Sequence, residues 1–269
     1  MVRRTPSGIV ARRHGRHDPS GSDVVLVHGG ADRAASFRNV VGHLGDLPVV
    51  VYDRRGYGES LDLAPARSLA DHAADLLEVI GERPAAVVAH SFGGHVAVLA
   101  AITRPDLVRV LGLYEPPVPW MDFWPPQPRA SLAAIVGDQD PGAVAERIYV
   151  AVSGRGGWER LTEDERQVRR REGAAFCADI ASELDAPYDW DDLAVPVLFG
   201  HGSRTWPYSR DACAELAARL GQPEHEIDGA THVGHVTHPE GFAAFVRATV
   251  ALGDRSPAPP TAVTGDPTG

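Results

Sequence analysis

The stretch from Ala85 to Thr103 constrains the fold of this chain more than any other. A short apolar run, Ala85–Ala89, leads directly into His-Ser-Phe-Gly-Gly and then into a second apolar segment. This pattern predicts a buried strand that turns sharply into a helix, with Ser91 at the bend. So tight a turn holds the serine in a strained backbone conformation and leaves room only for small neighbours, which Ala89 and Gly93 are.

Two interpretations of Ser91 follow from this pattern. Serine is common at helix N-caps, so Ser91 could simply begin a buried helix. Alternatively its hydroxyl is a nucleophile, and the helix points unpaired N–H groups, notably that of Phe92, to where negative charge develops on an attacked carbonyl. The succession of strand, turn and helix favours the second interpretation.

Strands and helices alternate along the rest of the chain. Apolar runs typical of strands buried on both faces of a parallel sheet are Val24–Val27, Val49–Tyr52, Val108–Tyr114 and Val195–Gly200. A weaker pattern predicts an edge strand over 8–16 and a short last strand over His225–Ile227. Helices are expected over 68–80, where Ser68 and Asp71 are spaced as a capping box, and over 211–220 and 240–252. The alternation predicts an α/β fold, with a mostly parallel central sheet and helices on both faces.

Three motifs resemble those of the α/β-hydrolase family. The residues around Ser91 are similar to the family's GxSxG elbow, with Ala89 in the first position, a departure of one methyl group. Residues 53–60 are similar to its DxRGxGxS turn, whose role is largely structural. His28, Gly29 and Gly30 follow the first buried run, as a His-Gly pair does in the family.

The resemblance implies a set of site residues. In the family the residue after the His-Gly pair offers its backbone N–H as the second oxyanion donor, which assigns Gly30 that role beside Phe92. A serine nucleophile needs a base, and the family's histidine lies on the loop after the last strand. Segment 228–235 fits that loop, and His232 falls at the expected distance from Gly229.

Other interpretations of the late histidines stay open. His235 is a rival base. Together with His225 and His238 it could also suggest a metal site, but no carboxylate or cysteine accompanies them in a recognisable pattern. Pro239 interrupts any helix that would place them on one face. We therefore expect no metal and no cofactor.

The acid of the triad departs from the commonest family pattern. Counting from Pro196 along the next-to-last strand, the usual site falls on Thr205, which cannot carry a negative charge. Some members of the fold place the acid at the end of the strand after the elbow helix, where this chain has Glu115. We predict the triad Ser91, Glu115 and His232, with Asp211 and Asp228 as alternative acids.

A long segment of different character separates the Val108–Tyr114 strand from the Val195–Gly200 strand. It is rich in proline and aromatic residues and has helix-like patterns over 141–152 and 163–184. We expect a helical cap over residues 116–192, a core formed by 1–115 and 193–253, and a disordered tail over 254–269. Aromatic residues in and near such a cap can line an apolar pocket or simply pack, and the candidates are Trp120, Phe123, Trp124 and Trp206.

The composition of the chain indicates which classes of binding partner to expect. The formal charge of −10 gives no electrostatic reason to bind nucleic acid or an anionic membrane, so a small-molecule substrate is expected. Two cysteines without CxxC spacing indicate neither a disulfide framework nor a thiolate metal site. There is no long apolar run and no signal-peptide pattern, so a cytoplasmic location is expected. The oligomeric state is not predicted.

The resemblance implies a serine hydrolase acting on an ester, thioester or lactone of a small, apolar or aromatic molecule. Serine at the elbow argues against epoxide or carbon–halogen cleavage, because those family members use aspartate there. The same triad serves carbon–carbon bond hydrolysis, perhydrolysis and biosynthetic acyl transfer or cyclisation. A non-catalytic binding role is a further alternative, since fold alone does not determine function.

Overall fold

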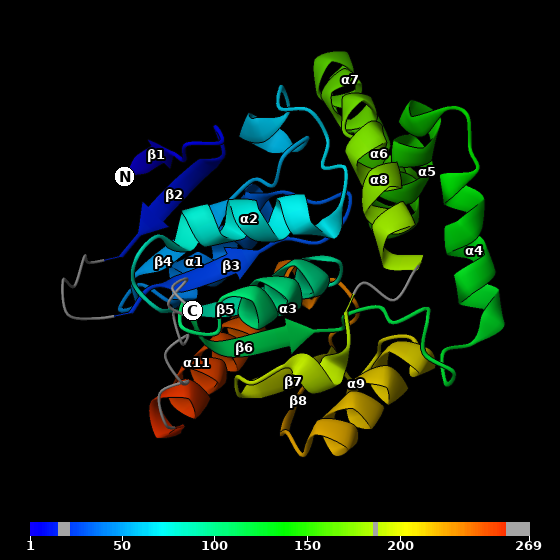
Figure 1. Ribbon diagram of the computed structural model, residues 1–269. Coiled ribbons are helices and arrows are strands. Elements are labelled where there is room, and N and C mark those ends of the chain that lie inside the picture. The colour runs from blue at the N-terminus through cyan, green and yellow to red at the C-terminus, as the bar shows by residue number, and fades with distance from the viewer. Residues whose placement is uncertain (16–21, 185–187, 257–269) are drawn as a thin grey trace, which may run out of the picture.

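The computed structural model describes residues 1–15, 22–184 and 188–256 (Figure 1). Within these residues eight strands form one sheet in the order β1-β2-β4-β3-β5-β6-β7-β8. Their bounds are β1 Val2–Arg4, β2 Val10–His14, β3 Val24–Val27, β4 Val49–Tyr52, β5 Ala85–His90, β6 Val108–Tyr114, β7 Val197–Gly202 and β8 Glu224–Ile227. The β1–β2 and β2–β4 pairs are antiparallel and all others are parallel, which confirms the predicted mostly parallel sheet.

Helices cover both faces of this sheet. Apolar side chains of α2 (Leu69–Ile80), α3 (Gly93–Thr103) and α9 (Pro207–Leu220) form one core with one face. Those of α1 (Arg38–His43) and α11 (Pro239–Arg255) form a second core with the other. The central strands β3 and β5 are buried throughout, because helices pack on both sides of them.

Within the described residues, five further α-helices lie between β6 and β7 in the chain. They are α4 (Pro126–Val136), α5 (Pro141–Ser153), α6 (Arg155–Glu159), α7 (Glu163–Arg171) and α8 (Gly173–Leu184). Figure 1 shows this insertion, in green, grouped beside the end of the sheet toward which β6 points. Helices α4 and α6 were not expected from the sequence, because α4 has no clear apolar face and α6 is only five residues long.

Three local expectations were wrong. The edge strand is β1, which pairs outside β2, so β2 lies within the sheet. Ser68 begins α2 without a side-chain cap bond, and the Asp71 carboxylate instead accepts the N–H of Arg67 at 2.8 Å. Helix α11 continues through Arg255, beyond the tail boundary predicted at 254, and Asp254 in its last turn pairs with Arg109 of β6.

The remainder of the predicted tail, 257–269, lies outside the described residues. Among the residues that are described, no helix is both long and apolar enough to cross a membrane.

The first turn of α3 passes very close to β3. A β-carbon placed on Gly93 would lie 2.7 Å from the carbonyl oxygens of Val27 and His28, closer than such atoms approach. We expect Gly93→Ala to lower the free energy of unfolding by about 2–3 kcal/mol through overpacking, measured by urea denaturation. Gly42→Ala in α1 is the matched control, since nothing lies within 4 Å of the added methyl, and it should not destabilise the protein. Equal losses for both would contradict the close approach.

Candidate active site

Ser91 occupies the turn between β5 and α3 in a left-handed conformation. Its φ is +52°, and its N–H donates to the carbonyl of Tyr114 at 2.9 Å, which joins the turn to β6. A side chain in this region of φ/ψ space is strained by about 1–2 kcal/mol. Helix α3 begins at Gly93, and among the described residues the Ser91 hydroxyl makes no hydrogen bond to the first turn, so this hydroxyl does not cap the helix.

Glu115 follows the neighbouring strand in the same unusual conformation, with φ of +49°. Its side chain is buried, and its two oxygens accept three hydrogen bonds. Oε1 accepts from the N–H of Gly202 at 2.9 Å, while Oε2 accepts from the Thr205 hydroxyl at 2.6 Å and lies 2.8 Å from Nδ1 of His232. The carboxylate is therefore held in one orientation.

Two contacts hold the loop that carries His232 against the ends of β5 and β6. The hydroxyl of Tyr114 donates to the carbonyl of Thr231 at 2.9 Å, and Nε2 of His90 lies 2.8 Å from the carbonyl of His232. Burial, followed by the nearby His235 and His232, lowers the pKa of His90 well below its usual value. His90 is therefore neutral and donates from Nε2. Because His90 precedes Ser91, this bond ties the histidine loop to the elbow.

The loop after β3 runs alongside Ser91. A β-carbon placed on Gly29 would lie 3.0 Å from Cβ of Ser91 and 2.9 Å from Nδ1 of His90, so glycine is required for this approach. Gly30 follows Gly29 on this loop, and Phe92 follows Ser91 at the elbow. Each of the two contacting segments therefore carries one candidate oxyanion donor. Burial lowers the pKa of His28 to about 3, with a smaller contribution from Arg54, so His28 is neutral.

The alternative residues lie elsewhere. Asp211 is exposed and pairs with Arg210 at 3.2 Å, and Asp228 is exposed and accepts from the Ser203 hydroxyl at 3.1 Å. His235 is buried, with Nε2 3.1 Å from Asp32, and does not share the carboxylate of Glu115. Neither alternative acid contacts His232.

One group in the described part of the chain could hold a metal ion. Ligand atoms of Asp32, His90 and His235 all lie within 4.8 Å of one another. The sequence suggested His225, His235 and His238 instead, and only His235 belongs to this group. In the structure the Nε2 atoms of both histidines make the hydrogen bonds given above, whereas their Nδ1 atoms are buried without a hydrogen-bond partner.

The four aromatic candidates for a substrate pocket take different places. Trp206 is 52% exposed and lies against His232, with ring centroids 5.3 Å apart. Trp120 contacts His95, and the buried Trp124 packs on Tyr208. Phe123 is 39% exposed. Trp206 is thus the one of these four that a recorded ring contact joins to a triad residue.

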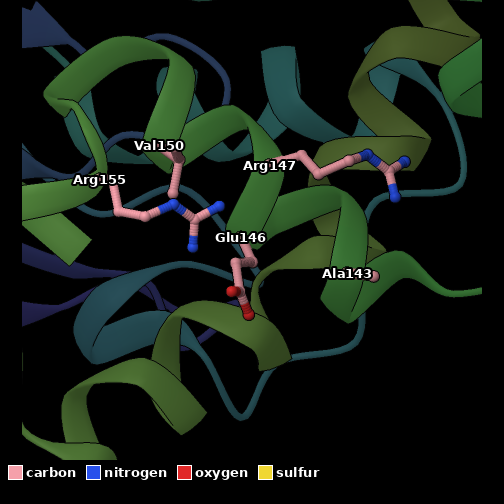
Figure 2. Close-up of a pocket in the computed structure, with 5 residues that line it drawn as sticks. All are labelled: Ala143, Glu146, Arg147, Val150 and Arg155. Atoms are coloured by element: carbon pink, nitrogen blue, oxygen red, sulfur yellow. The ribbon is translucent and has the colours of Figure 1, made fainter. Parts of the chain in front are cut away.

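A pocket of about 400 Å³ lies on the insertion, lined by Ala143, Glu146, Arg147, Val150 and Arg155 (Figure 2). Its lining comes from α5 and α6 and includes none of the triad residues. Glu146 and Arg147 are also engaged in ion pairs, with Arg170 and Asp138. Its lining contains no serine, cysteine or histidine, so we place the candidate site at Ser91.

Sequence reasoning missed part of the surroundings of Glu115. Thr205 was singled out only because it lacks a charge, whereas its hydroxyl donates to the acid. The count along the strand had already located the position, and a hydroxyl there was the available signal. Arg54 was assigned no contact with the site, although its guanidinium reaches the loop of Gly29.

The chain is similar in sequence and in fold to known proteins. A model of the "Alpha/beta hydrolase family" matches residues 24–245. Lipase LipV of Mycobacterium tuberculosis is 38% identical over 106 residues, which cover 38% of this chain and 41% of the lipase. The chain thus matches about two fifths of the length of that relative.

Two further proteins match a larger part of this chain. The pimeloyl-[acyl-carrier protein] methyl ester esterase of Chromobacterium violaceum is 29% identical over 235 residues, which cover 82% of this chain and 91% of the esterase. The crystal structure of the enol-lactonase from Burkholderia xenovorans LB400 has a TM-score of 0.71 at 16% identity, covering 93% of this chain and 100% of the lactonase. At that identity the structural likeness concerns the fold alone.

Proposed function

Because the chain belongs to the alpha/beta hydrolase family, we propose that it hydrolyses carboxylic esters, thioesters or lactones of small molecules through an acyl-enzyme on Ser91. The observation that carries this proposal is the 2.8 Å contact between His232 Nδ1 and the buried Glu115, on a loop tied to the residue before Ser91. A serine within hydrogen-bond reach of an imidazole that a carboxylate holds becomes a nucleophile at neutral pH.

In the proposed reaction, His232 takes the proton from Ser91 Oγ as that oxygen attacks the carbonyl carbon. Glu115 holds the imidazole by Nδ1–H and stabilises its positive charge. The N–H groups of Gly30 and Phe92 donate to the oxyanion, and loss of one such donor raises the barrier by about 3 kcal/mol. The leaving oxygen or sulfur takes the proton from His232. Water, deprotonated by His232, then releases the acid and frees Ser91.

The substrate class is proposed from two observations. The sequence relatives named above are a lipase and a methyl ester esterase, and these names support cleavage of an ester bond. Trp206 presents an exposed ring beside His232, which favours an apolar or aromatic group next to the scissile bond. The insertion between β6 and β7 would act as the cap of the site.

A screen of p-nitrophenyl esters and acyl thioesters of graded chain length tests the proposal. We expect turnover that depends on chain length, together with labelling of Ser91 by a fluorophosphonate probe located by peptide mass spectrometry. Turnover at pH 7 should be lost after labelling. A folded protein that neither turns over these substrates nor reacts with the probe would overturn the proposed function and favour a binding role.

A further inference from the structure

A buried ion pair joins the insertion to the loop after β4. Arg54 follows β4, and Asp179 belongs to α8 of the insertion. Each side chain is only 1% exposed. The guanidinium contacts the carboxylate through both terminal nitrogens, Nη1 to Oδ1 at 3.1 Å and Nη2 to Oδ2 at 2.7 Å. Such a two-point contact fixes the plane and direction of the arginine fork.

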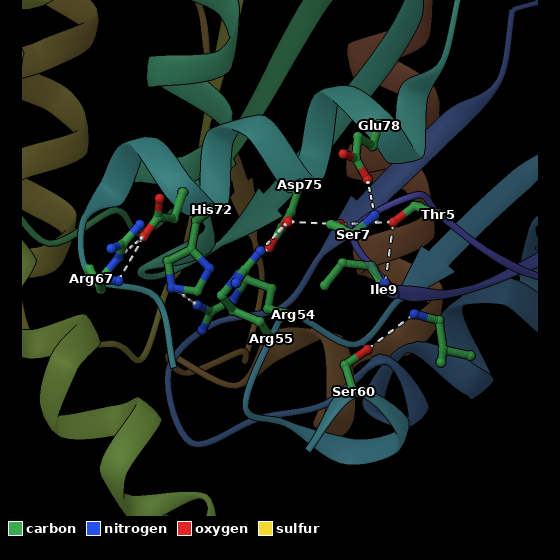
Figure 3. A network of polar contacts seen from close by, with 12 residues as sticks. Thr5, Ser7, Ile9, Arg54, Arg55, Ser60, Arg67, His72, Asp75 and Glu78 are labelled. Atoms are coloured by element: carbon green, nitrogen blue, oxygen red, sulfur yellow. Dashed lines mark hydrogen bonds and ion pairs between the residues drawn. The ribbon is translucent and has the colours of Figure 1, made fainter. Parts of the chain in front are cut away.

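Two more donors hold Asp179. The hydroxyl of Tyr57 donates to Oδ2 at 2.7 Å, and Nε2 of His72 lies 3.0 Å from Oδ1. Although burial alone raises the pKa of Asp179, the charge of Arg54 and the bond from His72 hold it below its ordinary value. The carboxylate therefore stays ionised. In Figure 3 the side chains of Arg54 and His72 lie against each other, with Nη1 and Nε2 3.3 Å apart. The neighbouring Arg55 instead donates to Asp75.

The same guanidinium also binds the loop beside Ser91. Nη2 of Arg54 donates to the carbonyl of Gly29 at 2.9 Å, and Nε donates to the carbonyl of His28 at 3.1 Å. The backbone N–H of Arg54 donates to Nε2 of His28 at 2.9 Å, so the proton of this neutral imidazole is on Nδ1. That Nδ1–H donates to the carbonyl of Gly29 at 2.8 Å.

These bonds fix the peptide group between Gly29 and Gly30. Peptide bonds in the described residues are all trans, so the N–H of Gly30 points away from the carbonyl of Gly29. Two donors that hold the carbonyl on one side therefore set the direction of the N–H on the other. Hydrogen bonds to a carbonyl also polarise its peptide, which makes the N–H a better donor.

Helix α8 contacts this peptide directly as well. A β-carbon placed on Gly30 would lie 2.9 Å from the ring of Phe176 and 3.9 Å from Oδ2 of Asp179. Phe176 and Asp179 are neighbours on one face of α8, because residues three apart lie one above the other on a helix. The insertion therefore reaches the loop both by packing on Gly30 and, through Arg54, by holding Gly29.

We propose that Arg54 is a positioning residue for the oxyanion hole, and that Asp179 of the insertion fixes Arg54 in that role. The inference rests on the proposed function, since the N–H of Gly30 is an oxyanion donor only if Ser91 attacks a carbonyl. The guanidinium of Arg54 then connects the position of α8 to the direction of the Gly30 N–H that stabilises the transition state.

Arg54→Lys tests the inference, because lysine keeps the charge but cannot hold Asp179 and the Gly29 carbonyl in one fork. We expect kcat to fall about 10–100-fold with KM within about threefold, since a misdirected donor costs less than the 10²–10³-fold of a lost one. The affinity for an alkyl boronic acid, which forms a tetrahedral adduct on the serine, should fall by the same factor as kcat/KM.

Two matched controls carry the same substitution. Arg55 is the residue after Arg54, and Arg55→Lys loosens its two-point contact with Asp75 of α2. Arg33→Lys loosens another ion pair between the core and the insertion, the one with Glu172. Both are expected to keep kcat within about twofold even if they unfold at lower temperature. Equal losses of kcat in the controls and in Arg54→Lys would overturn the positioning role.

Asp179→Asn provides a second variant should Arg54→Lys fail to fold. It is expected to lower kcat about tenfold, because in either orientation the amide NH₂ faces one nitrogen of Arg54, a donor, where the carboxylate accepted. A rise in kcat would overturn the inference, since it would mean that the carboxylate acts only by repelling the oxyanion. Wild-type protein without ester turnover and without labelling at Ser91 would overturn the proposed function together with the inference. Active wild type with unchanged variants would overturn the inference alone.

Discussion

Replacing Ser91 with alanine is expected to lower kcat by on the order of 10⁶-fold, because no acyl-enzyme can form and the remaining groups act together with the nucleophile. Stability should be unchanged. Serine and alanine carry the same β-carbon at a φ of +52°, and among the described residues the serine hydroxyl makes no hydrogen bond whose loss would weaken α3. Initial rates with p-nitrophenyl butyrate and urea denaturation measure the two quantities.

Ser182→Ala is the control for this substitution. Ser182 is also half-buried, and its hydroxyl donates to the carbonyl of Ala178 within α8. It should leave kcat unchanged. Loss of about 0.5–2 kcal/mol of stability in Ser91→Ala with activity retained would contradict the assignment, since that is the signature of a helix cap.

The central strands were predictable from sequence because burial on both faces leaves an uninterrupted apolar run. β3, β4 and β6 have the expected bounds for this reason. The outermost elements were less predictable. The three residues of β1 are all exposed and give no pattern, so β2 was mistaken for the edge.

The proposed triad was assigned from sequence by resemblance to the family, and each of its members follows a predicted strand. Ser91 and Glu115 come directly after the buried strands β5 and β6, and His232 lies on the loop after β8. Contacts between distant segments leave no sequence pattern. Arg54 and Asp179 are 125 positions apart and come together only because α8 packs on the loops at the end of the sheet. Their pairing depends on tertiary packing, which no local residue pattern encodes.

Glu115→Gln is expected to lower kcat by on the order of 10⁴-fold, through the tautomer of His232. The N–H of Gly202 faces Oε1 and can only donate, so the glutamine carbonyl must take that place and the NH₂ group must face His232. Nδ1 must then accept, which leaves the proton on Nε2, the nitrogen that has to receive the proton of Ser91. The shape of the side chain is preserved, so stability should change far less than the rate.

Asp211→Asn and Asp228→Asn are the matched controls, since each replaces an acid by its amide. Both carboxylates are exposed and contact residues other than His232, so kcat should stay within about twofold of the wild-type value. Rates with p-nitrophenyl butyrate at pH 7 compare the three variants. If either aspartate variant loses as much activity as Glu115→Gln, the acid has been assigned to the wrong strand end. If only Glu115→Gln is impaired, the carboxylate after β6 orients the base.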